Sequence, residues 1–303
     1  MLAQAIPLKY REKPLVQTKM PTGGSFEKFI GNVFSTTADF DGTVEKVNKD
    51  VITVRGGDGK VKTYNLYDNF PLNNKCFIDS EIRVKPGDKV KMGQTLADTT
   101  YTKDGTLAIG TNLRVGIMPF RDTTFEDGYT ISESAAKKLT SEHLREASVN
   151  IGKNDLMSPK AFAAHFPTAI SKNNLEKLDE DGVVRVGQRV DPGDVLITHL
   201  QKTEASEEDA RLGKLSKKLV KGYRNDMQIW DKDVVGTVTD VVKTPDGVRV
   251  LIRDEEPMQI GDKMVNRHGA KGIVSAIIPD KEMPMTKDGK HLDVIISPSA
   301  MPG

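Results

Sequence analysis

The sequence GDKMVNRHGAKG, at residues 261–272, is the most informative stretch of the chain. It places two lysines, an arginine and a histidine within nine residues, and Asp262 is its only acid. Its glycines make it a poor helix, but they suit a loop in which backbone and cationic side chains approach polyanions closely. Lysine offers phosphate a compact point charge, and arginine offers a planar fork. Charge alone is equally compatible with an exposed basic turn.

Outward from this loop, the chain is predicted to form mainly short β-strands separated by Gly, Pro and Asp. The predicted strands are 44–54, 61–66, 82–84, 113–118, 183–186, 195–198, 234–242, 248–252, 273–278 and 292–296. Helices are expected only at 132–147, capped by Ser132, at 158–169, opened by Ser158-Pro159, and at 211–224. The predicted fold class is therefore mainly β with few helices.

A Gly-Asp pair followed by an apolar strand start recurs in residues 84–97, 186–198 and 258–265. Gly adopts positive φ without strain and Asp bonds nearby backbone, so these pairs predict tight turns. The third pair lies inside the cationic loop, which gives it a richer chemical context.

The charge balance excludes a globally basic nucleic-acid coat, because 44 Lys and Arg face 43 Asp and Glu, for a net charge of +1. Any nucleic-acid contact must use a local patch. The single cysteine, Cys76, excludes an internal disulfide and a cysteine-based zinc site. Runs of about 18 apolar residues are absent, so no membrane span and a cytoplasmic location are expected.

Residues 211–224 carry six basic side chains and no acid, above leucines at helical spacing. This pattern is typical of a solvated surface helix. A contact with nucleic acid or with a partner subunit is the functional alternative.

Further motifs follow in order along the chain. They are MLAQAIP (1–7) with KPLVQT (13–18), GTNLRV (110–115), MPF and FEDGYTISE (118–133), and MP, DG and DVIISP (283–298). Together with GDKMxxRHGxKG they closely resemble the β subunit of multisubunit DNA-dependent RNA polymerases, over nearly the whole chain.

The resemblance implies a double-psi β-barrel with an inserted flap- or wall-like domain. Residues 1–30 would end an upstream fork-like segment, 31–135 and 256–303 would form the two parts of the barrel region, and 136–255 would be the insertion. The partner β′ subunit would supply the second barrel and the Asp triad that holds Mg²⁺. Other polymerase subunits, template DNA, the RNA transcript and nucleoside triphosphates are the remaining implied partners, with no membrane.

The same resemblance implies the site residues. Lys263 and Lys271 would be the catalytic cations, facing the RNA 3′ end and the phosphates of the incoming nucleotide. Glu126 and Asp127 would lie near the second Mg²⁺ as outer-sphere groups, although an adjacent acidic pair is also typical of a turn. Gln4 would lie beside the growing RNA end.

Arg267 and His268 complete the implied RNA-binding set. Arg267 is also expected to order its loop by bonding backbone carbonyls or an acid, and His268 is equally compatible with a structural hydrogen bond. The implied topology brings Lys263 and Lys271 close to the acidic pair, although more than 130 residues intervene.

Asp39 and Asp41 mimic a metal-binding string of the β′ subunit, but Thr43 replaces the third Asp, so a turn is expected there. Asn266 and Ala270 depart from the signature at positions where many members carry Gly and Asn. The chain also opens and stops inside the family pattern, which suggests a fragment or one piece of a split β subunit, as in some large phages. The isolated chain should not catalyse RNA synthesis, and the alternative function is a non-catalytic nucleic-acid-binding or assembly module.

Overall fold

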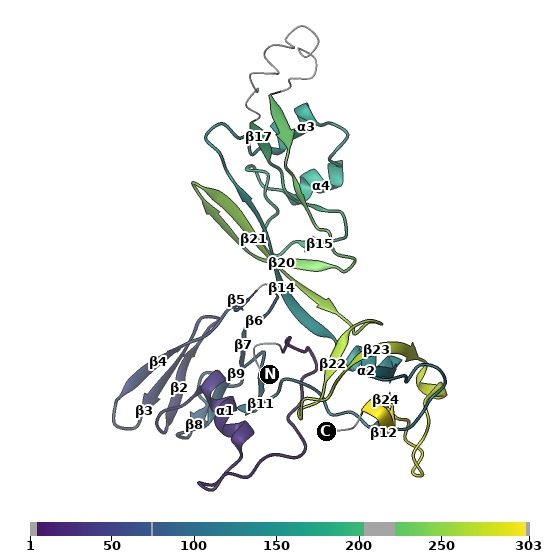
Figure 1. The fold of residues 1–303 in the computed structure, drawn as a ribbon. Coiled ribbons are helices and arrows are strands. Elements are labelled where there is room, and N and C mark those ends of the chain that lie inside the picture. The colour runs from purple at the N-terminus through teal and green to yellow at the C-terminus, as the bar shows by residue number, and fades with distance from the viewer. Residues whose placement is uncertain (1–4, 74, 203–221, 301–303) are drawn as a thin grey trace. The chain divides into compact units, whose positions relative to one another are not determined.

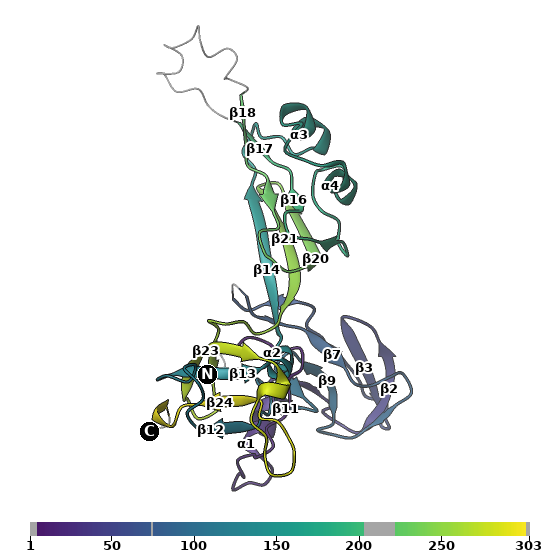
Figure 2. The ribbon, with the colours of Figure 1, turned by 90° about the vertical axis from the view of Figure 1, so that its right-hand side faces the viewer.

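The computed structural model describes residues 5–73, 75–202 and 222–300 (Figure 1). The chain forms two compact units: unit 1 comprises Met1–His143 and Glu256–Gly303, and unit 2 comprises Leu144–Glu255. Unit 2 is therefore inserted into the sequence of unit 1. Strands dominate both units and the helices are short, which confirms the expected mainly β class (Figures 1 and 2).

The first part of unit 1 combines one helix, α1 (Phe26–Phe34), with small antiparallel sheets. The sheet of order β4-β3-β2-β8 buries Val44, Ile52 and Val54 on its inner face. The strands are β1 (Thr36–Thr37), β2 (Gly42–Val47), β3 (Val51–Gly56), β4 (Val61–Asn65), β5 (Phe70–Pro71), β6 (Phe77–Ile78), β7 (Ser80–Ile82), β8 (Lys89–Val90), β9 (Thr95–Thr99), β10 (Thr102–Lys103) and β11 (Thr106–Leu107).

The rest of unit 1 is a five-stranded sheet of order β12-β24-β13-β23-β22. Its strands are β12 (Val115–Ile117), β13 (Gly128–Ser132), β22 (Lys263–Val265), β23 (Lys271–Ile278) and β24 (Val294–Ile296). The central strand β13 is parallel to β23 and antiparallel to β24, and all of its residues are buried. Helix α2 (Glu133–Lys138) follows it directly, and the short 3₁₀ helices η3 (Asp280–Glu282) and η4 (Pro298–Ala300) flank β24.

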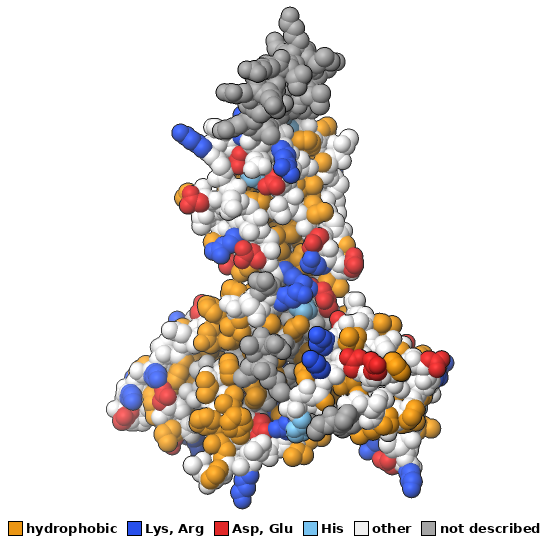
Figure 3. All heavy atoms as spheres, in the orientation of Figure 1, with side chains coloured by type: hydrophobic (Ala, Val, Ile, Leu, Met, Phe, Trp, Pro, Cys, Tyr) orange, Lys and Arg blue, Asp and Glu red, His pale blue; other side chains and the backbone are white. Residues whose placement is uncertain are grey.

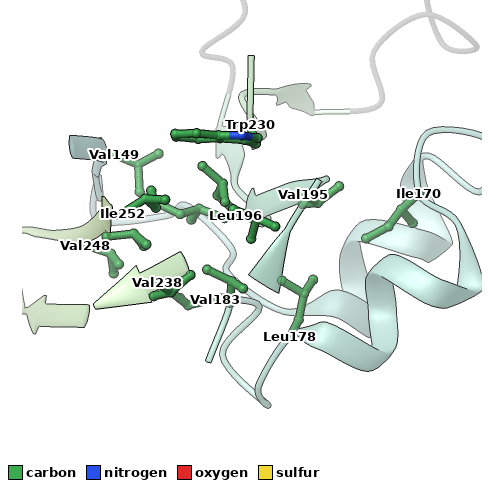
Figure 4. Packing of buried hydrophobic residues seen from close by; sticks show 14 of the residues in the cluster. Val149, Ile170, Leu178, Val183, Val195, Leu196, Trp230, Val238, Val248 and Ile252 are labelled. Carbon is green, nitrogen blue, oxygen red and sulfur yellow. The ribbon is translucent and has the colours of Figure 1, made fainter. Parts of the chain in front are cut away.

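Unit 2 contains a four-stranded sheet of order β14-β21-β20-β15 and two strand pairs, β16–β19 and β17–β18. Trp230 lies in its core with Val149, Leu196 and Ile252 around it (Figure 4). The elements are β14 (Ser141–Asn150), α3 (Pro159–His165), α4 (Lys172–Lys177), β15 (Arg189–Val190), β16 (Val195–Ile197), β17 (Leu200–Lys202), β18 (Tyr223–Asn225), β19 (Gln228–Ile229), β20 (Gly236–Thr244) and β21 (Gly247–Glu256).

The helix predicted over 132–147 is wrong in its second half. Ser132 caps α2 as expected, with its hydroxyl accepting from the Ala135 N–H at 3.1 Å, but the helix ends at Lys138. Residues from Ser141 onward form β14, because three consecutive side chains starting at Glu142 are buried in the sheet. Burial in the sheet overrides the local helical propensity of this segment.

The strand predicted over 44–54 is a hairpin, β2–β3. The Asn48 carboxamide oxygen accepts from the N–H groups of Asp50 and Val51 at 3.0 and 2.7 Å, which turns the chain between the strands. The 158–169 helix is confirmed as the shorter α3, which Pro159 opens after the Ser158 cap. Residues 211–221 of the predicted basic helix lie outside the described residues, and Tyr223 and Arg224 belong to β18.

The three predicted Gly-Asp turns are confirmed. Each glycine has a positive φ, between 87° and 93°. Each aspartate carboxylate accepts from the backbone N–H three residues earlier, at 2.7–2.8 Å. The turns end at Asp88, Asp194 and Asp262.

Candidate functional site

The β22–β23 hairpin places the two predicted catalytic lysines on one face. In its register Lys263 lies opposite Ile273 and Val265 lies opposite Lys271. Side chains alternate along a strand, so these four residues share a face, and all four are exposed. The two lysines are therefore diagonal neighbours on adjacent strands, within reach of one common ligand.

The Gly-Asp turn before β22 fixes the start of this hairpin. The Gly261 N–H donates to the Val274 carbonyl at 2.8 Å, and the Val274 N–H donates to the Asp262 carbonyl at 2.8 Å. The Asp262 carboxylate accepts from the Gln259 N–H at 2.8 Å. The only acid of the cationic loop thus holds its own turn.

The acidic pair occupies a tight turn beside β23. The Gly128 N–H donates to the Phe125 carbonyl at 2.9 Å, and Glu126 has a φ of 49°, which is uncommon for a residue other than glycine. The Asp127 carbonyl accepts from the Ile273 N–H at 2.9 Å. This backbone contact confirms that the acidic pair meets the lysine hairpin; the chemical roles of these residues stay predictions.

Gly272 explains how the two segments approach so closely. A Cβ atom at this position would overlap the Asp127 carbonyl oxygen and the Tyr129 ring. Ser275 further along β23 donates from its hydroxyl to the carbonyls of Thr123 and Tyr129, the latter at 3.0 Å. The acidic turn is therefore held against β23 on both sides of Asp127.

The site combines free charges of both signs. Within residues 5–73, 75–202 and 222–300, the side chains of Lys263, Lys271, Glu126 and Asp127 are exposed and form no hydrogen bond or ion pair. Burial raises the pKa of Tyr129, and the negative charge of Asp127 raises that pKa further. Exposed ammonium groups can bind phosphate, and paired carboxylates suit a hard cation or its bound water.

Arg267 and His268 lie in the hairpin tip between the lysines. The Arg267 guanidinium donates to the Val16 carbonyl and to the Glu27 carboxylate, which confirms the expectation that it orders the loop. His268 is exposed, and in the described part of the chain its imidazole makes no hydrogen bond. Among the described residues, the His268 imidazole therefore does not have the structural hydrogen-bonding role that was considered for it.

Two residues of the site were missed by the sequence reasoning. Asn266 organises the tip, because its carboxamide oxygen accepts from the N–H groups of His268 and Ala270 at 2.9 and 3.1 Å. The spacing Asn-x-x-Gly is a turn signal that could have identified it. Glu27 lies on α1, and no local pattern connects it with Arg267.

The remaining candidates lie elsewhere. Gln4 is outside the described residues. Asp39 forms an ion pair with Lys62, which lowers the pKa of its carboxyl, and the Asp41 carboxylate accepts from the Met92 N–H at 2.7 Å. Residues 39–41 form a bend that leads into β2, and both carboxylates have these partners within the chain.

Charge on the surface is mixed. Blue and red side chains lie in small groups over the face drawn in Figure 3, as the near-zero net charge predicts.

On α1, Phe26, Phe29 and Val33 are exposed large hydrophobic side chains. Among the helices that the structure describes, none is long and apolar enough to cross a membrane.

The fold and the site define a β-rich module that presents paired lysines beside an acidic turn. Residues 37–303 match the family described as RNA polymerase Rpb2, domain 6, and the chain belongs to this family.

Several relatives are named DNA-directed RNA polymerase subunit beta. Those from Clavibacter michiganensis subsp. michiganensis and Thermus thermophilus are each 32% identical to this chain over 321 residues, and the one from Rubrobacter xylanophilus is 34% identical over 319 residues. All of this chain is covered in these matches, but it spans only 27–28% of the length of these relatives.

Proposed function

We propose that this chain forms the catalytic-centre part of the β subunit of a DNA-directed RNA polymerase, which makes RNA on a DNA template by nucleotidyl transfer. The observation that carries the proposal is the exposed pair Lys263 and Lys271 on one face of the β22–β23 hairpin, against the turn at Glu126-Asp127. The names of the similar β subunits support it.

The physical role of the lysines follows from the charge of the reaction. Nucleotidyl transfer develops negative charge on the α-phosphate and on the departing pyrophosphate. Ammonium groups held on paired strands stabilise that charge with little reorganisation. We assign to Lys263 and Lys271 the contacts with the RNA 3′ end and the nucleotide phosphates, and to His268 at the exposed tip a contact with RNA. Arg267 acts through the position of the loop.

Glu126 and Asp127 fit a contribution to Mg²⁺ binding. Mg²⁺ is held by one or two carboxylates together with waters and substrate phosphates, and both carboxylates are exposed. When bound, the metal supplies electrostatic stabilisation of phosphate oxygens. We assign its main ligands to the partner β′ subunit. In the described ranges, no three acidic, histidine or cysteine side chains gather as metal ligands would.

We extend the proposal to the architecture. The five-stranded sheet of unit 1 is assigned to a double-psi β-barrel, because β13 lies between β23 and β24, which follow each other along the chain. Unit 2, which lies within the sequence of unit 1, is assigned to the flap- or wall-like domain. Template DNA, the RNA transcript, nucleoside triphosphates and the other polymerase subunits are the proposed partners.

Reconstitution tests the proposal. The chain, mixed with the remaining polymerase subunits, is expected to restore templated RNA synthesis. A variant with Lys263→Ala and Lys271→Ala should assemble and bind DNA normally but extend RNA at least about 10²-fold more slowly, since each cation serves the transition state. Normal extension by an assembled double variant would instead favour the non-catalytic assembly or nucleic-acid-binding module.

A further inference from the structure

We propose that Glu27 is a positioning residue for the lysine hairpin, because its buried carboxylate holds Arg267 and thereby fixes the tip between Lys263 and Lys271. The proposal rests on the function proposed for the two lysines, and it names the group that orders them. Glu27 lies 240 residues from Arg267 in the sequence.

The surroundings of Glu27 favour the ionised form of its carboxylate. Its side chain is 5% exposed. One carboxylate oxygen accepts from the Thr18 N–H at 2.9 Å, and the other accepts from the Thr18 hydroxyl at 3.2 Å and from Arg267. Burial opposes ionisation, but hydrogen bonds from backbone N–H groups, Arg267 and the Thr18 hydroxyl outweigh it and hold the pKa of Glu27 below its ordinary value. A buried charge of this kind is stable only with such partners.

Arg267 connects two separate segments to the tip. One guanidinium nitrogen donates to the Val16 carbonyl and another donates to Glu27. A planar guanidinium with diverging donors restricts the orientation of the loop that carries it, which a single lysine bond would not do. Among the residues that the structure describes, the other hydrogen bonds of the tip are internal and run through Asn266 and Ala270. Arg267 thus ties the tip to two other segments of unit 1.

Helix α1 gives Glu27 a firm support. Ser25 caps the helix by accepting from the Lys28 N–H at 3.1 Å, and the Lys28 ammonium donates to the Asp104 carbonyl at 2.9 Å. Gly31 lies so close to the β10–β11 turn that a Cβ atom there would overlap backbone of Gly105 and Leu107. A positioning group works best on a rigid element of this kind.

A double-mutant cycle in the assembled polymerase separates positioning from simple stability. Glu27→Gln keeps the size of the side chain but removes its charge, and is expected to slow single-nucleotide addition about tenfold. In a Lys271→Ala background the same change should cost less than about twofold, since the group that it positions is gone. Glu45→Gln is the matched control, because Glu45 pairs with Arg55 on the distant β2–β3 hairpin. It should leave the rate unchanged.

Equal losses in both backgrounds, or no loss at all, would overturn the positioning role. Arg267→Lys is the second variant, and it should give an intermediate loss with the same dependence on Lys271. Hydrogen exchange in the full chain provides a readout that does not need activity: amides of residues 266–270 should exchange faster in Glu27→Gln, and unchanged exchange would also overturn the proposal. If Lys271→Ala alone has no effect on nucleotide addition, the proposed function fails, while the exchange result still decides whether Glu27 holds the tip.

Discussion

Three turn-strand elements share one backbone geometry, but only one of them carries the candidate site. Each element consists of a turn and the short strand after it, paired with a facing strand. In the first element residues 85–90 pair with residues 42–44, in the second residues 185–190 pair with residues 236–238, and in the third residues 259–264 pair with residues 272–274. In each, the turn glycine N–H donates to a valine carbonyl on the facing strand at 2.7–2.8 Å, and the N–H of that valine donates back at 2.8–2.9 Å. The facing valines are Val44, Val238 and Val274.

The residue after the turn is cationic in every element. Lys89, Arg189 and Lys263 begin β8, β15 and β22, and the next residue of each strand pairs with a glycine. A cation after a Gly-Asp or Gly-Gln turn therefore belongs to the scaffold and does not by itself mark a phosphate site.

The neighbours make the difference. The residue before the paired glycine is Asp41 in the first element, Val235 in the second and Lys271 in the third. The facing strand of the third element also pairs with β13, which brings the acidic turn alongside. The site therefore arises from the second lysine, Lys271, and from the adjoining strand β13.

Lys263 and Lys89 occupy equivalent positions in their turn-strand elements, but their replacement should have very different consequences for activity. In the assembled polymerase, Lys263→Ala should reduce the elongation rate about 10²-fold, because a fixed cation at the reacting phosphates is removed. Lys89→Ala removes an exposed lysine from the same position of the same turn-strand geometry, and the rate should stay within about twofold of wild type, as for most surface changes. Stopped-flow nucleotide addition measures both. Equal effects of the two variants would contradict the assignment of the site.

The second effect concerns the paired glycines, Gly272 and Gly42. A Cβ atom at Gly272 would overlap Asp127 and Tyr129, and one at Gly42 would press on the Arg55 carbonyl. Each Gly→Ala change should lower the free energy of unfolding by about 1–3 kcal/mol through overpacking. Gly57 has open space around its Cβ position, so Gly57→Ala is the control. Chemical denaturation of the full chain provides the values, and a Gly272→Ala variant as stable as wild type would show that the close approach to Asp127 is not required.

Local chemistry explains what could be predicted from the sequence. Gly261-Asp262 predicted a turn because glycine alone tolerates the φ of 93° and aspartate reaches back to the Gln259 N–H. The apolar run after Lys271 predicted β23. The meeting of the lysine hairpin with the acidic pair was implied only by family resemblance, since no period or spacing links segments so far apart.

Long-range packing explains what could not be predicted. The end of α2 at Lys138 depends on the burial of Glu142, His143 and Leu144 in β14, although their local composition favours a helix. The pairing of Glu27 with Arg267 depends on how α1 packs within unit 1. In the sequence, Glu27 and Arg267 are ordinary charged residues, and neither indicates a distant partner. The recurring Gly-Asp pair already linked the first and third turn-strand elements, but the equivalence of the second, which turns at Gly187-Gln188, became visible only through matching hydrogen bonds.

A smaller change in the free energy of unfolding is expected when the turn aspartates are replaced, and it shows whether Asp262 serves only its turn. Asp88 and Asp262 each accept one backbone hydrogen bond in the same position of the turn. Asp→Ala at either site should lower the free energy of unfolding by about 0.5–1.5 kcal/mol, the contribution of one such bond. Replacement by Asn, whose carboxamide oxygen can still accept, should restore most of the loss. A loss at Asp88 with none at Asp262 would show that the two turns are not equivalent.

The smallest effect concerns stability at acid pH. It is specific to the third turn-strand element, because Arg267 in the tip of its β22–β23 hairpin pairs with the buried Glu27. The folded-state pKa of Glu27 lies below its ordinary value of 4.5. The unfolded chain therefore binds the proton more tightly, so the contribution of this carboxylate is complete above pH 4.5 and is lost as the pH falls toward the lowered folded-state pKa. Glu27→Gln should make the decline of stability below pH 4.5 shallower, whereas Glu45→Gln, at an exposed pair, should follow wild type. Urea denaturation of the full chain at a series of pH values measures the slopes. Parallel curves for Glu27→Gln and wild type would mean that Glu27 gains no net stabilisation from Arg267 and Thr18.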